Sequence, residues 1–244
     1  MLKGQIVDGL SLLSWTRPIE MDRARQRRNC VLNLSSPIVS PTTVFDVSGK
    51  GNHGTLTGAI WVREPSGVSA LDYDGTDDFT EGPGAVSLGL GSYMIKVWVI
   101  SDLAAGAEWE KSFCRNFDVA TSTRAFNMFL SDTGTWNVGL FDNVGAATNL
   151  TSNISVIIGN PTMICLVHNA LTGRFQIFVN GVQANDTTDP ANLQTALGTF
   201  RFGYGATANR FFDGGISLPL VITRVPTAAE IMEIYNQERH LFAK

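Results

Sequence analysis

The stretch 163–181, MICLVHNALTGRFQIFVNG, decides the fold class of this chain. It opens with a continuous apolar run and continues with alternation, so that Phe175, Ile177 and Val179 share one face. A period of two is the pattern of a half-buried β-strand. Asn180-Gly181 then stands between apolar residues, which is the strongest short-range signal for a hairpin. The stretch therefore predicts strands at 162–168 and 174–179, with a tight turn after the second.

Similar short apolar runs recur along the chain from about residue 30, separated by clusters of Gly, Asn, Asp, Ser and Thr. No alternation of strands with long helical patterns is visible, which disfavours a parallel sheet. More than ten short strands predict an all-β, two-sheet antiparallel sandwich of the jelly-roll type. The expected strands are Cys30–Leu34, His53–Thr57, Ala70–Tyr73, Tyr93–Ile100, Glu110–Phe117, Ala125–Leu130, Trp136–Phe141, Thr162–His168, Arg174–Val179, Thr199–Phe202 and Ile216–Thr223.

The composition agrees with one β-rich domain. The chain has 244 residues, a length at which all-β sandwiches still form a single unit. Charged residues make up 16%, well below the usual level of about 25%. Gly, at 24 residues, and Phe, at 14, suit turns and strands. These values exclude a helical bundle, a disordered acidic chain and a protein that binds nucleic acid over its whole surface.

Residues 1–29 have a different character and form a predicted N-terminal arm with an apolar patch and an arginine cluster. Residues 1–31 hold six basic and three acidic side chains, whereas residues 32–237 hold 10 basic and 18 acidic ones. A basic arm before an acidic body favours an acidic partner surface, although a solvated helix face is the alternative. We expect the arm to dock on other proteins of an assembly through Leu12, Leu13, Trp15, Arg17, Arg23, Arg25, Arg27 and Arg28.

The end of the chain predicts one short helix. Thr227 follows Pro226, and Glu230 stands three residues after the threonine, as in a capping box. Apolar residues then recur at helical spacing. The expected organisation is an arm at 1–29, a sandwich at 30–237 and a polar tail at 238–244.

The three cysteines, Cys30, Cys114 and Cys165, have no metal-ligand spacing, and we expect three free thiols. The first residues lack the pattern of a secretory signal. No apolar run reaches the roughly 18 residues of a membrane span. We therefore expect no membrane span and synthesis without a signal peptide.

Six segments, taken in order, resemble one known family. The run DVSGKGNHGTL at 46–56 is similar to its opening motif, and ALDYDGTDDF at 70–79 to its next motif. The strand at 93–100, the pair at 163–181, and the segments FRFG and FDGGI followed by the TAAEI helix complete the series. Together they resemble the laminin G-like jelly roll of the concanavalin A-like lectin/glucanase superfamily, over about residues 30–237. Pro219 departs from the family pattern and indicates an edge or a bulge in its strand.

This resemblance implies a possible Ca²⁺ site, because members often bind one ion through loop oxygens. Hard cations prefer such oxygen ligands. Asp46 and Asn52 offer such oxygens in the motif at 46–56. For Asp77 and Asp78 the alternative role is to cap turns through their side chains. The densest acidic cluster supplies the candidate ligands Asp72, Asp74, Asp77 and Asp78.

The superfamily also contains glucanases, whose retaining mechanism needs two carboxylates about 5–5.5 Å apart. In those families a Glu-x-Asp-x-x-Glu run on one strand provides them, and this chain has no such run. Glu108 and Glu110 are the nearest pair and lack a third acid. The histidines His53, His168 and His240 are isolated, which favours structural roles. The sequence therefore predicts no enzyme.

Glycan binding usually relies on exposed aromatic rings beside polar side chains. Trp61 and Trp98 occupy positions that the resemblance assigns to the core. Other aromatic residues lie at turns, where a core role is the alternative. The candidate ligand-binding residues are Trp109, Trp136, Tyr204 and Asn209.

The sequence thus favours a non-enzymatic binding or structural module. Its expected setting is the surface of a virus particle, as an oligomeric decoration or fibre protein. The arm would dock to the assembly, and the lectin-like sandwich would project to bind glycan or protein. The alternatives are a secreted or cell-surface carbohydrate-binding module and, less favoured, a glycoside hydrolase. A genome neighbourhood of capsid or tail genes would favour the virus-particle protein over these alternatives.

Overall fold

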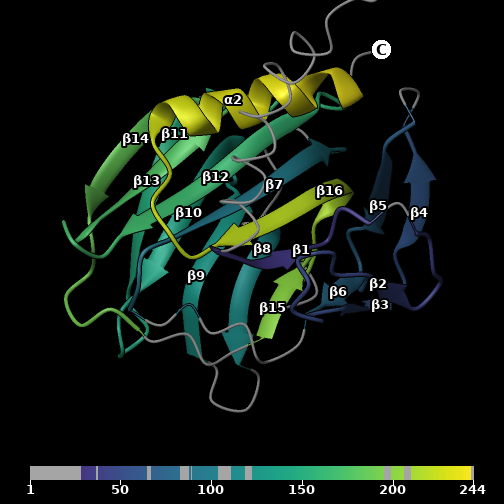
Figure 1. Ribbon diagram of the computed structural model, residues 1–244. Helices are drawn as coiled ribbons and strands as arrows, with labels where there is room; N and C mark the ends of the chain where they lie inside the picture. The colour runs from purple at the N-terminus through teal and green to yellow at the C-terminus, as the bar shows by residue number, and fades with distance from the viewer. Residues whose placement is uncertain are drawn as a thin grey trace, which may run out of the picture.

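Two antiparallel sheets of eight strands each pack face to face in the computed structural model (Figure 1). The prediction of an all-β sandwich with a short C-terminal helix is confirmed. The structure describes residues 29–36, 38–64, 67–82, 88, 90–103, 111–118, 123–194, 199–205 and 210–242.

The first sheet has the strand order β14-β13-β12-β7-β16-β5-β4, and β1 also pairs with β16. Its long central strands come from the apolar runs of the sequence. The strands are β1 (Cys30–Asn33), β4 (Ile60–Arg63), β5 (Ser69–Asp74), β7 (Tyr93–Ser101), β12 (Thr162–Asn169), β13 (Arg174–Val179), β14 (Val182–Thr188) and β16 (Asp213–Ile222).

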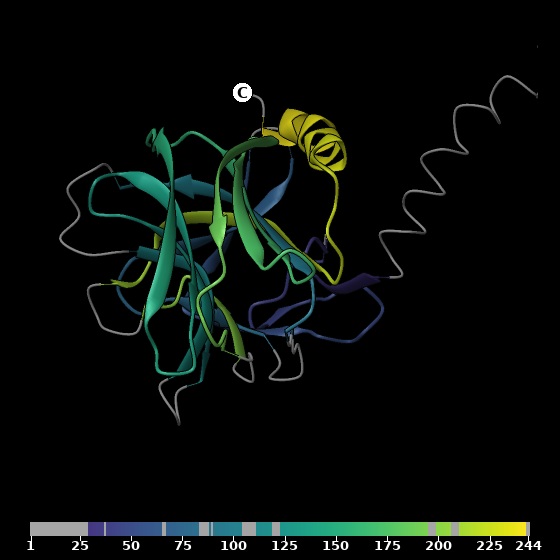
Figure 2. The same ribbon diagram turned by 90° about the vertical axis from the view of Figure 1, so that its left-hand side faces the viewer.

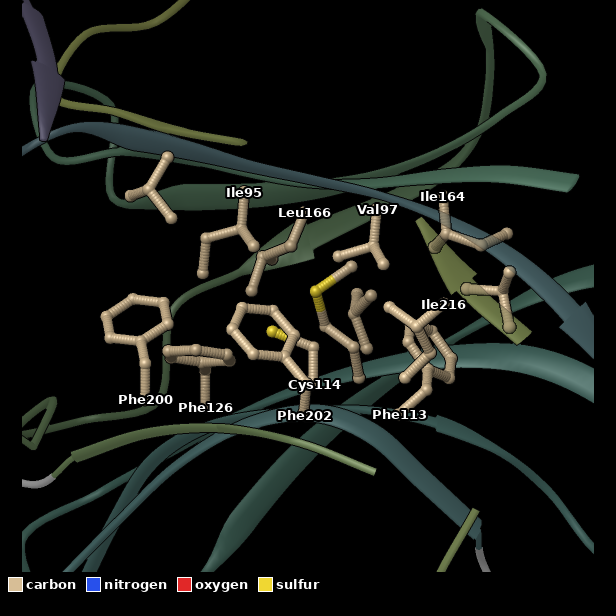
Figure 3. Close-up of a cluster of buried hydrophobic side chains, with 14 of the residues drawn as sticks. Ile95, Val97, Phe113, Cys114, Phe126, Ile164, Leu166, Phe200, Phe202 and Ile216 are labelled. Carbon is tan, nitrogen blue, oxygen red and sulfur yellow. The ribbon is translucent and has the colours of Figure 1, made fainter. Parts of the chain in front are cut away.

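The second sheet has the order β11-β10-β9-β8-β15-β6-β3-β2. In Figure 3 its strands arch toward the core, which leaves its outer surface concave. The strands are β2 (Thr43–Val44), β3 (Gly54–Thr57), β6 (Phe79–Glu81), β8 (Lys111–Asp118), β9 (Thr123–Leu130), β10 (Thr135–Phe141), β11 (Ala147–Ser155) and β15 (Thr199–Phe202).

The main core lies between the two sheets. Alternation along each strand directs every second side chain inward, and aliphatic residues of the first sheet meet aromatic residues of the second. Burial of this apolar surface is the dominant stabilising contribution, at about 25 cal/mol per Å². Figure 3 shows Ile95, Val97, Ile164, Leu166 and Ile216 opposite Phe113, Cys114, Phe126, Phe200 and Phe202.

The predicted turn at Asn180-Gly181 is confirmed. It joins β13 to β14 in a two-residue loop, and both residues have positive φ, 51° and 83°. This is the backbone of the turn that best fits the twist of a hairpin. Helix α2 (Ala228–Glu238) packs on the turn, since a Cβ on Gly181 would lie 3.0 Å from Met232 Sδ.

The bulge expected at Pro219 is also present. The register of β16 against β7 shifts between Ser217 and Leu220, and Leu218 has a φ of 48°. Before the bulge β16 pairs with β5, and after it with β1. The proline lies where the strand changes partners.

Helix α2 covers the outer face of the first sheet (Figures 1 and 2). Thr227 caps it as predicted, since its hydroxyl accepts from the Glu230 N–H and Glu230 accepts from the Thr227 N–H. A short 3-10 helix, η2 (Arg239–Phe242), follows and packs back onto the sheet, with Phe242 stacked on Trp98 at 4.4 Å. The segment expected as a polar tail thus contributes a buried side chain.

All three cysteines are free, as expected, and all three are buried. Burial raises the pKa of Cys165 to about 12 and that of Cys30 to about 11. Thiols with such values carry little thiolate at neutral pH and react slowly.

Candidate functional site: the outer face of the second sheet

A row of polar residues crosses the outer face of the second sheet. Glu81 on β6 lies opposite Arg201 on β15, which lies opposite Arg115 on β8. Arg115 lies opposite Asn127 on β9, which is followed by Gly139 on β10. The sequence neighbours of these residues, such as Phe126, Met128, Phe200 and Phe202, fill the core, so alternation turns the polar side chains outward.

An aromatic cluster lies at one end of this row. The guanidinium carbon of Arg201 is 4.3 Å from the ring centre of Tyr204, and Nη2 of Arg201 is 3.0 Å from a Glu81 carboxylate oxygen. Phe79 and Phe211 each pack edge-on against Tyr204 at 5.4 Å. An arginine over an aromatic face is a favourable cation–π contact. We call Phe79, Glu81, Arg201, Tyr204 and Phe211 the arginine–aromatic cluster.

The backbone fixes the segment that carries Tyr204. Gly203 N–H donates to the Phe113 carbonyl, and Phe212 N–H donates to the Gly203 carbonyl. Gly203 has a φ of 76°, and a Cβ there would lie 2.3 Å from the Tyr73 ring. Only glycine allows this close approach, so the position of Tyr204 is set by the core beneath it.

Asn127 occupies the middle of the polar row. The residue is 4% exposed, and within the described part of the chain its Oδ1 has no hydrogen-bond partner. Buried polar atoms are nearly always bonded, and an unmade bond costs about 1–3 kcal/mol. Next to it Gly139 leaves space that the Asn149 amide fills, since a Cβ would lie 2.3 Å from Asn149 Oδ1. Asn127 Oδ1 therefore has hydrogen-bonding capacity that no described residue uses.

The predicted aromatic candidates have different positions. Tyr204 lies on the outer face, within the arginine–aromatic cluster. Trp136 does not reach a surface, because the residue is 1% exposed and its ring packs edge-on against Phe113 in the core. Trp109 and Asn209 lie outside the described residues. Of the two expected core tryptophans, Trp98 is buried, and Trp61 is half-buried with its Nε1 donating to the Ser40 carbonyl.

Three of the four predicted metal ligands come together. One carboxylate oxygen from each of Asp74, Asp77 and Asp78 lies within 4.8 Å of the others. Asp74 Oδ1 accepts from the Thr76 N–H, and Asp78 Oδ2 accepts from the Asp74 N–H, so these side chains also cap the turn. The turn-capping role is therefore present, and these three residues could also hold a divalent cation.

Asp72 lies apart from that group on β5. Burial and the charges of Asp102 and Asp213 raise its pKa, and burial followed by the charges of Asp74 and Asp77 raises the pKa of Asp78. Accumulated negative charge at this end of the first sheet disfavours the ionised carboxylates. A bound cation would relieve that repulsion.

The motif at 46–56 is structural. The Asp46 carboxylate accepts from the Asn33 and Ser48 N–H groups, the Ser48 hydroxyl and the Asn52 N–H. Burial alone would raise the pKa of Asp46, but these hydrogen bonds together lower it. With every lone pair directed at a donor, Asp46 secures the loop.

Two histidines, His53 and His168, also have structural partners. His53 Nδ1 accepts from the Asp46 N–H. His168 is buried, with Nδ1 2.8 Å from the Gly91 carbonyl and Nε2 2.9 Å from Asp189 Oδ2. Glu108 and Glu110 lie outside the described residues.

Similarity to solved structures is extensive at low sequence identity. Domain 4 of the GH43 extracellular arabinanase AbnA from Geobacillus stearothermophilus, solved with arabinotriose, gives a TM-score of 0.66 at 16% identity, over 85% of this chain and 98% of that one. The botulinum neurotoxin serotype D ligand-binding domain, solved with N-acetylneuraminic acid, gives a TM-score of 0.70 at 12% identity, over 88% of this chain and 52% of that one. The binding domain of Paraclostridial Mosquitocidal Protein 1 gives a TM-score of 0.70 at 14% identity, over 87% of this chain and 53% of that one. The chain spans about half of the two toxin domains.

The fold and the strand order define a concanavalin A-like sandwich. The laminin G-type family model, described as the concanavalin A-like lectin/glucanases superfamily, matches residues 74–232, which is more than half of the chain. The chain belongs to this superfamily. No curated protein matches it in sequence. Within the described residues, no helix has the length and apolar character needed to cross a membrane.

Proposed function

We propose that this chain is a non-catalytic, lectin-like module that binds a carbohydrate on the outer face of the second sheet. The observation that carries the proposal is the polar row with the buried Asn127 Oδ1 beside the arginine–aromatic cluster. A sugar hydroxyl would donate to this oxygen, and Tyr204 would contact an apolar sugar face. Two of the similar domains were solved with sugars, which agrees with this choice of ligand class.

Catalysis is not part of the proposal. A retaining glycosidase needs two carboxylates about 5–5.5 Å apart. The polar row contributes one carboxylate, Glu81, and Arg201 already engages it. The row therefore suits recognition better than acid–base chemistry.

A glycan array with the full chain, followed by calorimetry on the sugars that bind, tests the proposal. Asn127→Ala should weaken binding about tenfold, which corresponds to one lost hydrogen bond. Tyr204→Ala should weaken it similarly, and Tyr204→Phe should retain most of it. Asn143→Ala is the matched control, because Asn143 is exposed at the turn between β10 and β11. An array without hits, or full binding by Asn127→Ala, would contradict the proposal.

We also propose the surface of a virus particle as the setting of this module, with the arm docked to other particle proteins. The support is the sequence of the arm, which combines an apolar patch with Arg23, Arg25, Arg27 and Arg28. Residues 1–28 of the arm lie outside the described residues. Replacing these four arginines with serine should reduce incorporation into particles while leaving sugar binding unchanged. Incorporation at the wild-type level would favour a secreted or cell-surface lectin.

A further inference from the structure

Strand β4 forms one edge of the first sheet and carries apolar side chains. Ile60 is 61% exposed, and Ile38 and Val39 of the preceding segment are 59% and 57% exposed. Trp61 holds this segment beside the strand through its bond to the Ser40 carbonyl. Unprotected sheet edges are templates for pairing with another strand.

The other sheet edges among the described strands are protected. On β1, which pairs only with β16, the Asn33 carbonyl accepts from the Val47 N–H and the Asn33 N–H donates to Asp46. Strand β2 has only two residues. Strand β14 carries the ion-paired Asp186, and its Asn185 donates to the Thr151 carbonyl of β11, which joins the two sheets on that side. Strand β11 is polar, with the sequence ATNLTSNIS. Among the described strands, β4 is thus the apolar edge without such protection.

The hydrogen bonds of the β4–β5 hairpin show which backbone groups are open. Glu64 N–H donates to the Val68 carbonyl, and the register places Val62 opposite Ala70 and Ile60 opposite Asp72. In an antiparallel pair every second residue bonds to the partner strand. Even-numbered residues of β4 therefore bond to β5, and the N–H and C=O groups of Trp61 and Arg63 face the open edge.

We propose that β4 pairs antiparallel with β4 of a second copy of this chain, around a two-fold axis at Val62. In this register Trp61 and Arg63 of one copy bond to Arg63 and Trp61 of the other, through four backbone hydrogen bonds. Val62 faces Val62 of the second copy, and Ile60 faces its Glu64. No like charges oppose each other, and the surface is self-complementary, as a two-fold interface requires. The two first sheets become one continuous sheet.

Side chains fit this register as well as the backbone does. Trp61 comes beside Arg63 of the second copy on the same face, which gives a cation–π pair on each side of the axis. A hollow of about 240 Å³ beside the strand offers space for side chains of the second copy. It is lined by Val39, Trp61, Val62, Arg63, Gly67 and Ser69.

Disulfide cross-linking tests the register of the proposed β4–β4 pairing directly. Non-hydrogen-bonded antiparallel pairs have Cα atoms about 4.5 Å apart, which a disulfide can span. Val62→Cys should give a disulfide-linked dimer under mild oxidation, since the native cysteines are buried. Ile60→Cys is the control, because the two copies of residue 60 lie four residues out of register, about 13 Å apart. Equal cross-linking of both variants, or none with Val62→Cys, would overturn the proposal.

Sedimentation equilibrium supplies an independent readout. The full chain should associate to dimers at micromolar concentration, and Val62→Lys should weaken the association at least tenfold by opposing two charges. Val182→Lys is the matched control, since Val182 is an exposed valine at the start of β14. Circular dichroism checks that each variant is folded. A monomeric wild type overturns the proposal. So does association that survives Val62→Lys but is lost on replacing Leu12, Leu13 and Trp15 with lysine, because the arm would then be the contact.

Discussion

Lys96 on β7 and Glu238 at the end of α2 form an ion pair beneath the helix. The Lys96 ammonium nitrogen is 2.7 Å and 2.6 Å from the two carboxylate oxygens, and its side chain is 2% exposed. Trp98 Nε1 donates to the same carboxylate at 2.6 Å. Since the two residues are 142 positions apart, this contact ties the C-terminal helix to the middle strand of the first sheet.

Removing the charge of Glu238 should destabilise the folded chain. We expect Glu238→Gln to lower the free energy of unfolding by about 3 kcal/mol, because Lys96 would be left buried without a counter-charge. The Lys96→Met/Glu238→Leu double variant should recover most of the loss. Urea denaturation measures both. A loss below about 0.5 kcal/mol for the single variant would show that the pair is solvated.

Asp46 should make stability depend on pH in the acid range. Its pKa is lowered in the folded chain, so its contribution is present above the unfolded value, about pH 4, and is lost as pH falls through the folded value. We expect Asp46→Asn to cost about 2 kcal/mol at pH 7, because two acceptor sites are lost. The gap to wild type should narrow below about pH 4. Asp132→Asn, at an exposed turn, should leave the profile unchanged.

His168 should be essential for packing at the end of β12. Both ring nitrogens face oxygen acceptors, and Tyr93 packs on the ring at 5.0 Å. His168→Leu would leave the Gly91 carbonyl and the Asp189 carboxylate without their hydrogen-bond partner, so we expect a loss of about 2–3 kcal/mol. Thermal unfolding is the measurement. Sugar binding by the folded variant should stay unchanged, and reduced binding would instead indicate a role in recognition.

Calcium should stabilise the chain through Asp74, Asp77 and Asp78. With an affinity near 10⁻³ M, typical of weak extracellular sites, 10 mM Ca²⁺ would add about 1.4 kcal/mol, or roughly 3–6 °C in Tm. Asp77→Asn should remove this response, and Asp186→Asn should keep it. A wild-type Tm that does not respond to Ca²⁺ would contradict the prediction, and the three carboxylates would then serve only to cap the turn.

Much of the architecture was predictable because its signals are local. All eleven expected strands correspond to observed ones, as do the Asn180-Gly181 turn, the capping box and the bulge at Pro219. The strands that the sequence did not reveal are short or polar. β11 and β14 are edge strands whose solvent-facing polar residues resemble a loop, and β2, β4 and β6 have four residues or fewer.

The candidate site was harder to predict, because it depends on register. Asn127 and Arg201 each lie between apolar neighbours, a pattern that indicates a solvent-facing position on a half-buried strand, whereas Arg115 is followed by the polar Asn116. Only the pairing of β15, β8 and β9 places them side by side. Trp136 was expected at the surface because it follows a turn, but alternation along β10 turns its ring into the core.

The pairing of β1 with β16 has a consequence for biosynthesis. The Thr223 hydroxyl donates to the Asn29 carbonyl across 194 residues, and β1 has no partner other than β16 among the described strands. At about 5–20 residues per second, a ribosome needs roughly 10–40 s to make the chain between them. During that time β1 waits without its partner strand, so the nascent sandwich passes through an open stage in which chaperones have access to its core.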